Sequence, residues 1–267
     1  MNTLSVNPMA VIGLPLTEQI QILDAQGTGH FGLHAPACAA HGWGASLTAL
    51  EKAEGSLAYL CHGPSASADD DASWAAEVRF LRSCIDFAAD AGAPWVYLTT
   101  GRQGSLLWEE AAARVAGHLA PLVEYARERA VGVVLENTMS IRSDISLTHS
   151  VRDAASLAAR IGASLCVDLY CCWGEADLER TLGENLDRIA IVQISDMLPG
   201  DLDLPNRRVP GDGAIPLGRL LSLVRDLGYG GLIDVELIGP EIDRQGPMRA
   251  LERSVEWLRA QLVEREE

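Results

Sequence analysis

The segment IVQISDMLPGDLDLPNRRVPGDG, residues 191–213, carries the pattern that decides the fold. It begins as a short apolar run, places Gln193, Ser195 and Asp196 at the end of that run, and continues as a loop rich in Pro, Gly and Asp. The apolar part is too short for an ordinary helix, and Gln and Asp are unfavourable to bury unless their oxygen atoms have partners. The segment therefore predicts a buried strand that delivers polar side chains to a loop.

The same pattern recurs along the chain, and amphipathic helical segments follow the strands. Strands are predicted at residues 9–14, 30–34, 57–60, 95–99, 132–136, 164–168, 189–195 and 232–237. Helices are predicted at residues 17–25, 45–53, 72–91, 106–130, 151–161, 176–186, 217–227 and 248–264. Eight strand–helix units predict an α/β fold with a parallel sheet closed into a (β/α)8 TIM barrel. The alternative is an open doubly wound sheet. A Gly-x-Gly-x-x-Gly turn would be expected after the first strand of such a sheet, and the region of Gly13 lacks one.

The length and composition favour a single domain over residues 1–267. Of the 267 residues, 48% are apolar, which is enough for a sizeable core, and no Gly/Ser-rich or Pro-rich linker interrupts the chain. Pro121 falls inside the predicted helix at residues 106–130 and is expected to kink that helix or split it in two.

The net charge of −16 disfavours nucleic-acid binding, because phosphate contacts need a basic surface. No apolar run reaches the roughly 18 residues of a membrane span, and the first residues lack the pattern of a signal peptide. The six cysteines show no Cys-x-x-Cys pair, which fits reduced thiols. We therefore expect a cytoplasmic protein without a membrane partner, and the sequence leaves open whether it forms a homo-oligomer.

Four consecutive predicted strands end in oxygen-bearing side chains. Glu136 is the last residue of strand five and Asp168 is the last residue of strand six. Gln193 lies near the end of strand seven, and Glu236 lies near the end of strand eight. A barrel brings the carboxyl ends of its strands to one rim, where the carboxylates would raise one another's pKa unless a cation lay between them. Oxygen ligands suit Mg2+ or Mn2+ better than a structural zinc ion, for which Cys and His would be expected.

These segments resemble the sugar phosphate isomerase/epimerase family of xylose isomerase-like barrels, which includes hydroxypyruvate isomerase and the ketose 3-epimerases. The resemblance is carried by VVLENT, CVDLYCCWGE, VQISD followed by NRRVPGDG, and GYGGLIDVEL, and it is strongest between residues 131 and 239. It implies one divalent metal ion (Mn2+, Mg2+ or Co2+) and an arginine that holds substrate oxygens. The implied metal ligands are Glu136, Asp168, Gln193 and Glu236, and the implied arginine is Arg207. Many relatives carry a substrate-binding His at the position of Cys171, a departure that bears on the substrate.

Other side chains near strand ends are candidates for contact with a substrate. His34 and His62 end predicted strands two and three or lie just beyond them, and Cys171 and Trp173 follow strand six. Each of these residues could equally be structural. Trp43 and Trp108 also follow strand ends, where a pocket wall and helix–barrel packing are both compatible with the sequence.

The predicted function is removal of a proton from a carbon next to a carbonyl group. Glu136 and Glu236 are the candidate acid and base, which gives a metal-dependent isomerase or epimerase acting on a small carbohydrate-like substrate. A lyase or dehydratase on the same site is the alternative, because both reactions begin with the same proton abstraction. Since the strand-end loops carry no lysine, we expect an unphosphorylated polyol or glycone flanked by an apolar group. Arg207 and Arg208 could still clamp a phosphate, so a sugar phosphate stays open.

Overall fold

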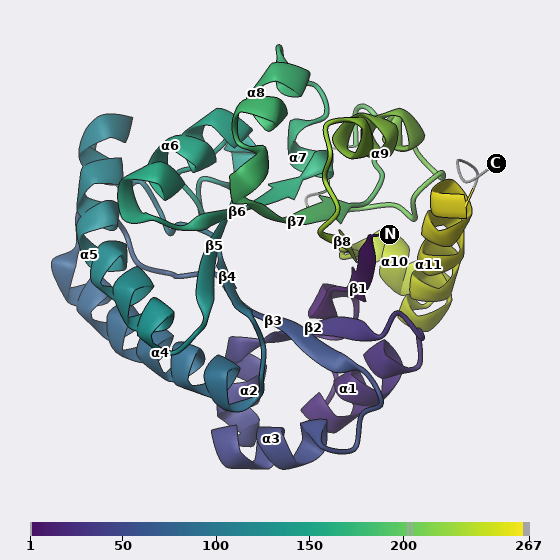
Figure 1. Cartoon of the computed structure of the whole chain (residues 1–267), viewed down its shortest axis with the longest axis horizontal. Coiled ribbons are helices and arrows are strands. Elements are labelled where there is room, and N and C mark those ends of the chain that lie inside the picture. The colour runs from purple at the N-terminus through teal and green to yellow at the C-terminus, as the bar shows by residue number, and fades with distance from the viewer. Residues whose placement is uncertain (1, 202, 204, 264–267) are drawn as a thin grey trace.

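The structure is a closed barrel of eight parallel strands, as the sequence predicts. It is a computed structural model that describes residues 2–201, 203 and 205–263. The strands follow one another around the barrel in chain order, and β8 closes the ring on β1 (Figure 1). Their bounds are β1 Thr3–Val6, β2 His30–His34, β3 Ser56–His62, β4 Trp95–Leu98, β5 Gly132–Glu136, β6 Ser164–Asp168, β7 Ile189–Ile194 and β8 Leu232–Val235.

The α-helices form a ring outside the strands (Figure 1). Their bounds are α1 Leu16–Asp24, α2 Ala35–His41, α3 Trp43–Leu50, α4 Asp71–Asp90, α5 Trp108–Glu128, α6 Val151–Ile161, α7 Leu169–Cys172, α8 Leu178–Glu184, α9 Leu217–Asp226, α10 Pro240–Gln245 and α11 Pro247–Val263. Short 3-10 turns occur at η1 Pro8–Val11, η2 Ser140–Arg142 and η3 Leu186–Arg188. The last residue of the helix predicted at 248–264 is Glu264, which lies outside the described residues.

The first strand was placed wrongly by the sequence pattern. The structure has β1 at Thr3–Val6, and the apolar run predicted as a strand at residues 9–14 begins inside the turn η1. Pro8 has no N–H to donate to a sheet, and the side chain of Asn7 caps the turn by accepting a hydrogen bond from the amide of Met9. This local capping ends the strand at Val6.

Two predicted helices also differ from the structure. The helix predicted at residues 45–53 is part of a pair, α2 and α3, which meet at Gly42, a residue with φ of +95° that favours glycine. The helix α5 runs unbroken through Pro121, so the predicted split is wrong. The prediction also lacks the short helices α7, which directly follows β6, and α10, which begins five residues after the end of β8.

Alternate residues of the strands pack inside the barrel, and this period of two determines which side chains reach the rim. Tyr97, Val134, Cys166 and Ile191 belong to a small buried cluster that is separate from the larger core between strands and helices. Two residues further along β5 and β6 are Glu136 and Asp168, and two further along β7 is Gln193. The predicted site residues of these strands therefore continue the inward-facing series.

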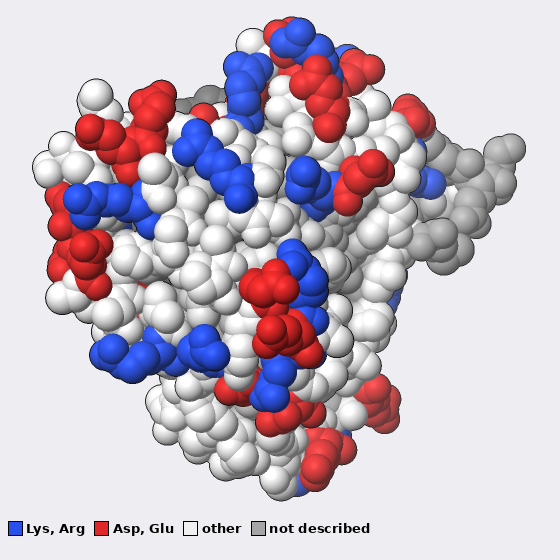
Figure 2. Space-filling view, turned by 60° about the vertical axis from the view of Figure 1, so that its left-hand side comes forward, with Lys and Arg blue, Asp and Glu red and all other residues white. Residues whose placement is uncertain are grey.

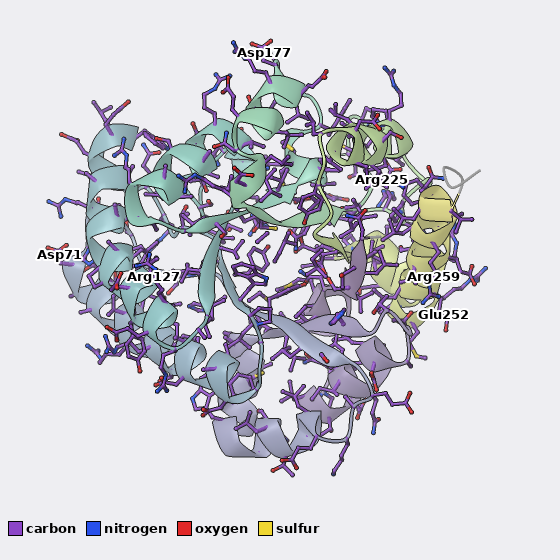
Figure 3. The ribbon with its side chains drawn as sticks, in the orientation of Figure 1. Asp71, Arg127, Asp177, Arg225, Glu252 and Arg259 are labelled. Carbon is purple, nitrogen blue, oxygen red and sulfur yellow. The ribbon has the colours of Figure 1, made fainter. Side chains whose placement is uncertain are left out.

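The outer surface carries charges of both signs. Figure 2 shows acidic and basic side chains interspersed on one face rather than gathered into a single basic region. The charged residues labelled in Figure 3 belong to the outer helices or to the loop before α8, and none comes from a strand. Among the described residues, no helix has both the length and the apolar composition needed to cross a membrane.

A glycine in β2 makes room for a buried tyrosine side chain inside the barrel. A Cβ atom at Gly32 would lie 2.2 Å from the ring of Tyr59, a fully buried residue whose hydroxyl donates to Asp234 at 2.9 Å. Gly32→Ala should therefore lower the free energy of unfolding by about 1–3 kcal/mol, as overpacking does. Gly44→Ala in α3 is the matched control, because its Cβ would meet nothing within 4 Å. Urea unfolding measures both, and an equal response of the two variants would contradict this account of Tyr59.

Candidate functional site

Three carboxylates from three strands converge at the rim of the barrel. Glu136 is the last residue of β5, Asp168 is the last residue of β6, and Glu236 directly follows β8. All three are buried, and one oxygen atom from each lies within 4.8 Å of the others. Asn137 fixes the first two strand ends relative to each other, because its side chain accepts a hydrogen bond from the amide of Asp168 at 3.0 Å and donates to the carbonyl of Asp168 at 3.2 Å.

The guanidinium group of Arg207 lies against two of these carboxylates. It donates to both oxygens of Asp168, at 3.3 and 2.7 Å, and its Nη2 lies 3.1 Å from Oε2 of Glu236. Ser195 accepts another of its hydrogen bonds at 2.9 Å, and the ring of Tyr170 lies beneath it at 4.4 Å. Because Arg207 is buried and surrounded by acceptors, its position is fixed by the site itself.

One arginine leaves the cluster with an excess of negative charge. Three ionised carboxylates and one guanidinium sum to a formal charge of −2. Burial, the repulsion of Glu236 and the repulsion of Asp168 raise the pKa of Glu136 well above its usual range, and burial raises the pKa of Glu236 to about 7. Oε2 of Glu236 is buried, and its ion-pair contact with Arg207 does not satisfy it with a hydrogen bond from the described residues. Charge and spacing therefore fit a divalent cation bound by these three residues.

Gln193 lies in β7, between the strands that carry Asp168 and Glu236. Its Nε2 donates to Asp234 at 3.0 Å, and its Oε1 accepts a long hydrogen bond of 3.4 Å from the hydroxyl of Tyr97. Because Asp234 can only accept when ionised, this contact orients the amide and leaves Oε1 as the atom available to a cation or substrate.

Asp234 is a buried carboxylate that the sequence analysis did not single out. It lies in β8, two residues before Glu236, and accepts hydrogen bonds from Ser5, Asn7, Tyr59 and Gln193. The period of two in LIDVEL could have revealed it, because residues 234 and 236 share a face of the strand. Burial raises its pKa, although all four neutral donors favour the ionised form.

Glu136 and Glu236 line a cavity of about 250 Å³. This volume is slightly below the roughly 300–1,000 Å³ typical of drug-sized ligands, so the cavity suits a small molecule. His34, His62, Cys171 and Arg207 line it, as the sequence analysis expected of substrate-contacting residues. Its apolar wall consists of Met9, Tyr97, Met139, Ile145, Tyr170, Pro205 and Ile238.

None of the three candidate tryptophans lines this cavity. Trp173 follows α7 and packs against the core, Trp43 contacts Phe87 with ring centroids 5.1 Å apart, and Trp108 donates to the carbonyl of Leu147. Helix–barrel packing is therefore their role in the fold. The apolar residues that line the cavity come instead from loops, the turn η1, the strand β4 and the helix α7, where an apolar residue gives no separate signal.

Cys171 stands beside the carboxylates as a neutral thiol. Its Sγ donates to Oδ2 of Asp168 at 3.0 Å, and burial raises its pKa well above the usual range. The thiolate form is thus disfavoured, and a nucleophilic role with it. His34 on the cavity wall is also neutral, because burial first and His62 second lower its pKa to about 4.

Known proteins with the same architecture include enzymes that act on sugars. A model of the "Xylose isomerase-like TIM barrel" family matches residues 18–261 of the chain. The fructoselysine 3-epimerase of Shigella flexneri is 25% identical over 193 residues, which are 70% of this chain and 67% of that protein.

Two solved structures share the fold over almost the whole chain. The 3-keto-D-glucoside 4-epimerase YcjR from E. coli has a TM-score of 0.78 at 17% identity, covering 97% of this chain and 100% of that one. The IOLI protein, solved with a zinc atom, has a TM-score of 0.80 at 16% identity, covering 97% and 98%. At such identities the likeness shows the fold alone. The match of the family model over residues 18–261 establishes that this chain belongs to the xylose isomerase-like TIM barrel family.

Proposed function

We propose that this protein is a divalent-metal-dependent sugar epimerase or isomerase that removes a proton from a carbon next to a carbonyl group. The observation that carries the proposal is the convergence of Glu136, Asp168 and Glu236 within 4.8 Å of one another, beside a small cavity that Glu136 and Glu236 line. Two relatives whose names denote epimerases of sugar derivatives, fructoselysine and a 3-keto-D-glucoside, support the reaction class. The lyase or dehydratase alternative receives no support from these relatives.

Glu136, Asp168, Glu236 and Oε1 of Gln193 would hold the metal ion. Their oxygen atoms suit Mn2+, Mg2+ or Co2+. The ion would polarise the substrate carbonyl and lower the energy of the enediolate that forms when the neighbouring C–H bond breaks.

The two glutamates supply the proton transfers. Burial makes both carboxylates more basic than a carboxylate in water, which suits a group that must take a proton from carbon. Glu236 takes the proton as the C–H electron pair moves toward the carbonyl, and Glu136 returns a proton to the same carbon or to its neighbour. Return to the same carbon from the other face gives epimerisation. Return to the former carbonyl carbon, with a hydroxyl proton moving from the oxygen of the new carbonyl to that of the old one, gives 1,2-isomerisation.

Arg207 and the cavity wall would hold the substrate. Arg207 keeps Asp168 and Glu236 in place and lines the cavity, so a substrate oxygen placed beside Glu236 could accept a hydrogen bond from it. Arg208 pairs with Asp201 at 2.7 Å and is not among the residues that line the cavity, so it does not form a phosphate clamp with Arg207. This arrangement supports an unphosphorylated sugar with an apolar flank.

One comparison of substrates tests the proposal directly. The metal-loaded protein is incubated in D2O with D-fructose, with its 6-phosphate and with an aryl-substituted glycone, and incorporation of deuterium next to the carbonyl is followed by NMR. We expect exchange into the two unphosphorylated compounds. Preference for the phosphate would overturn the substrate class, elimination of water or aglycone would indicate a lyase, and absence of exchange from all three would contradict the proposed reaction.

We predict one divalent ion per chain. Calorimetric titration of chelator-treated protein with Mn2+ should give a stoichiometry of one, and Asp168→Asn should weaken binding at least tenfold by removing a charged ligand. At a free Mn2+ concentration of 100 Kd the wild type should gain about 2.7 kcal/mol in unfolding free energy. Glu252→Gln, on the exposed face of α11, is the control and should bind like the wild type. Unaltered affinity in Asp168→Asn would place the ion elsewhere.

We predict that Glu236→Gln retains the fold and loses most of its turnover. The substitution preserves shape but removes the base, and loss of a general base lowers kcat on the order of 100-fold or more. Steady-state kinetics and circular dichroism measure the two properties. A rate close to that of the wild type would limit Glu236 to a ligand role and leave Glu136 as the sole base, which Glu136→Gln would then test.

A further inference from the structure

Two buried polar atoms in the wall of the cavity have no hydrogen-bond partner within residues 2–201, 203 and 205–263. They are Nδ1 of His62 and Oγ1 of Thr99, and both residues line the cavity that contains the carboxylates. The side chain of His62 is 9% exposed and Thr99 is 8% exposed, so bulk water reaches neither atom freely. Because buried polar groups in proteins are nearly always paired, two unpaired groups in one cavity wall indicate a place for a ligand.

The two residues are neighbours at the ends of adjacent strands. His62 ends β3, Thr99 directly follows β4, and the amide of Thr99 donates to the carbonyl of His62 at 3.3 Å. Gly63 lies beside them, and a Cβ atom there would approach Oγ1 of Thr99 to 3.1 Å. The absence of a side chain at residue 63 thus keeps the space around the hydroxyl open.

The ring of His62 is held in place from outside the barrel. Its Nε2 lies 2.8 Å from Oε2 of Glu77 in α4, and the ring of Phe80 packs against it at 4.8 Å. The other oxygen of Glu77 accepts hydrogen bonds from the amide and hydroxyl of Ser65, at 2.8 and 3.0 Å. An ionised carboxylate only accepts, so Nε2 carries a proton, and in the ring that carries this proton alone Nδ1 is an acceptor.

We propose that His62, Gly63 and Thr99 form a subsite for a sugar hydroxyl that is remote from the reacting carbon. A hydroxyl group can donate to Nδ1 and also accept from Oγ1–H, which matches the two unpaired atoms. In the closed ring of eight strands, β3 and β4 lie opposite β7 and β8, which carry Gln193 and lead to Glu236. A sugar held at the carboxylates would therefore extend toward this subsite. The inference rests on the proposed function for its sugar ligand.

Two substitutions remove the subsite with little change in shape. Thr99→Val deletes the unpaired hydroxyl and keeps the branched side chain. Glu77→Gln reverses the direction of the hydrogen bond to His62. The backbone amide of Ser65 donates to the side-chain oxygen of the glutamine, so the glutamine NH2 group faces Nε2 of His62 and donates to it. His62 then carries its proton on Nδ1, and the acceptor is lost. Thr48→Val, on the exposed face of α3, is the matched control.

The kinetic test compares D-fructose with its monodeoxy derivatives that lack one hydroxyl far from the carbonyl. In the wild type, deuterium exchange should be roughly tenfold less efficient in kcat/KM for one of these derivatives than for D-fructose, as loss of a hydrogen bond predicts. Thr99→Val and Glu77→Gln should abolish this difference, chiefly through KM for D-fructose, while Thr48→Val retains it. If Thr99→Val retains the full difference between D-fructose and the derivative, the subsite is overturned. If this variant also has a lower free energy of unfolding, the hydroxyl of Thr99 binds a structural water molecule.

A spectroscopic test works even if the proposed reaction is wrong. In protein with 15N-labelled histidine, the Nδ1 resonance of His62, assigned with His62→Gln, should shift when D-fructose is added, and Thr99→Val should reduce the shift. If the resonance moves but no substrate exchanges deuterium, the subsite stands and the proposed function fails. An unchanged Nδ1 resonance at saturating D-fructose would overturn the subsite, whatever the activity.

Discussion

Mutual repulsion among Glu136, Asp168 and Glu236 is the constraint on which the architecture of the rim depends. Three buried carboxylates within 4.8 Å of one another need a positive charge between them, and in the described chain Arg207 supplies one. Arg207 lies in the loop after β7, so that loop must fold back over the barrel. Its return is secured at Asp196, whose backbone pairs with that of Arg208 and whose carboxylate accepts hydrogen bonds from the amides of Met197, Gly211 and Ile215.

Asp234, a buried carboxylate one layer deeper in the barrel, shows another way to accommodate a buried negative charge. Asp234 is surrounded by four neutral donors instead of a cation. Such a group is satisfied without an ion, whereas Oε2 of Glu236 at the rim has an ion-pair contact with Arg207 but no hydrogen bond from the described residues. Gln193 joins the two layers, because its nitrogen is bound to Asp234 while its oxygen faces Tyr97, a cavity residue. The orientation of the Gln193 amide therefore depends on hydrogen bonds one layer deeper in the barrel.

The sequence predicts the barrel well where its strands are short, apolar and followed by amphipathic helices. Glu136, Asp168 and Glu236 could be placed at one rim because each ends or follows such a strand. The first strand was missed because hydropathy alone cannot separate the 3-10 turn after Asn7 from an apolar strand. The contact of Glu77 with His62 could not be predicted for another reason. Glu77 lies within α4, where an acidic residue ordinarily faces solvent, and only the packing of α4 on β3 brings it to His62.

The way the barrel closes has a consequence for how the chain reaches its native state during synthesis. Along its whole length β1 pairs with β8, from Thr3 with Leu232 to Val6 with Val235, but it meets β2 at a single registered pair. Ser5 and its acceptor Asp234 are 229 positions apart. Because β1 is synthesised before β8, the edge of β1 that pairs with β8 is unprotected until β8 emerges. Contacts of such long range slow folding and leave a nascent chain open to aggregation, so chaperones have most to protect in the interval before β8 emerges.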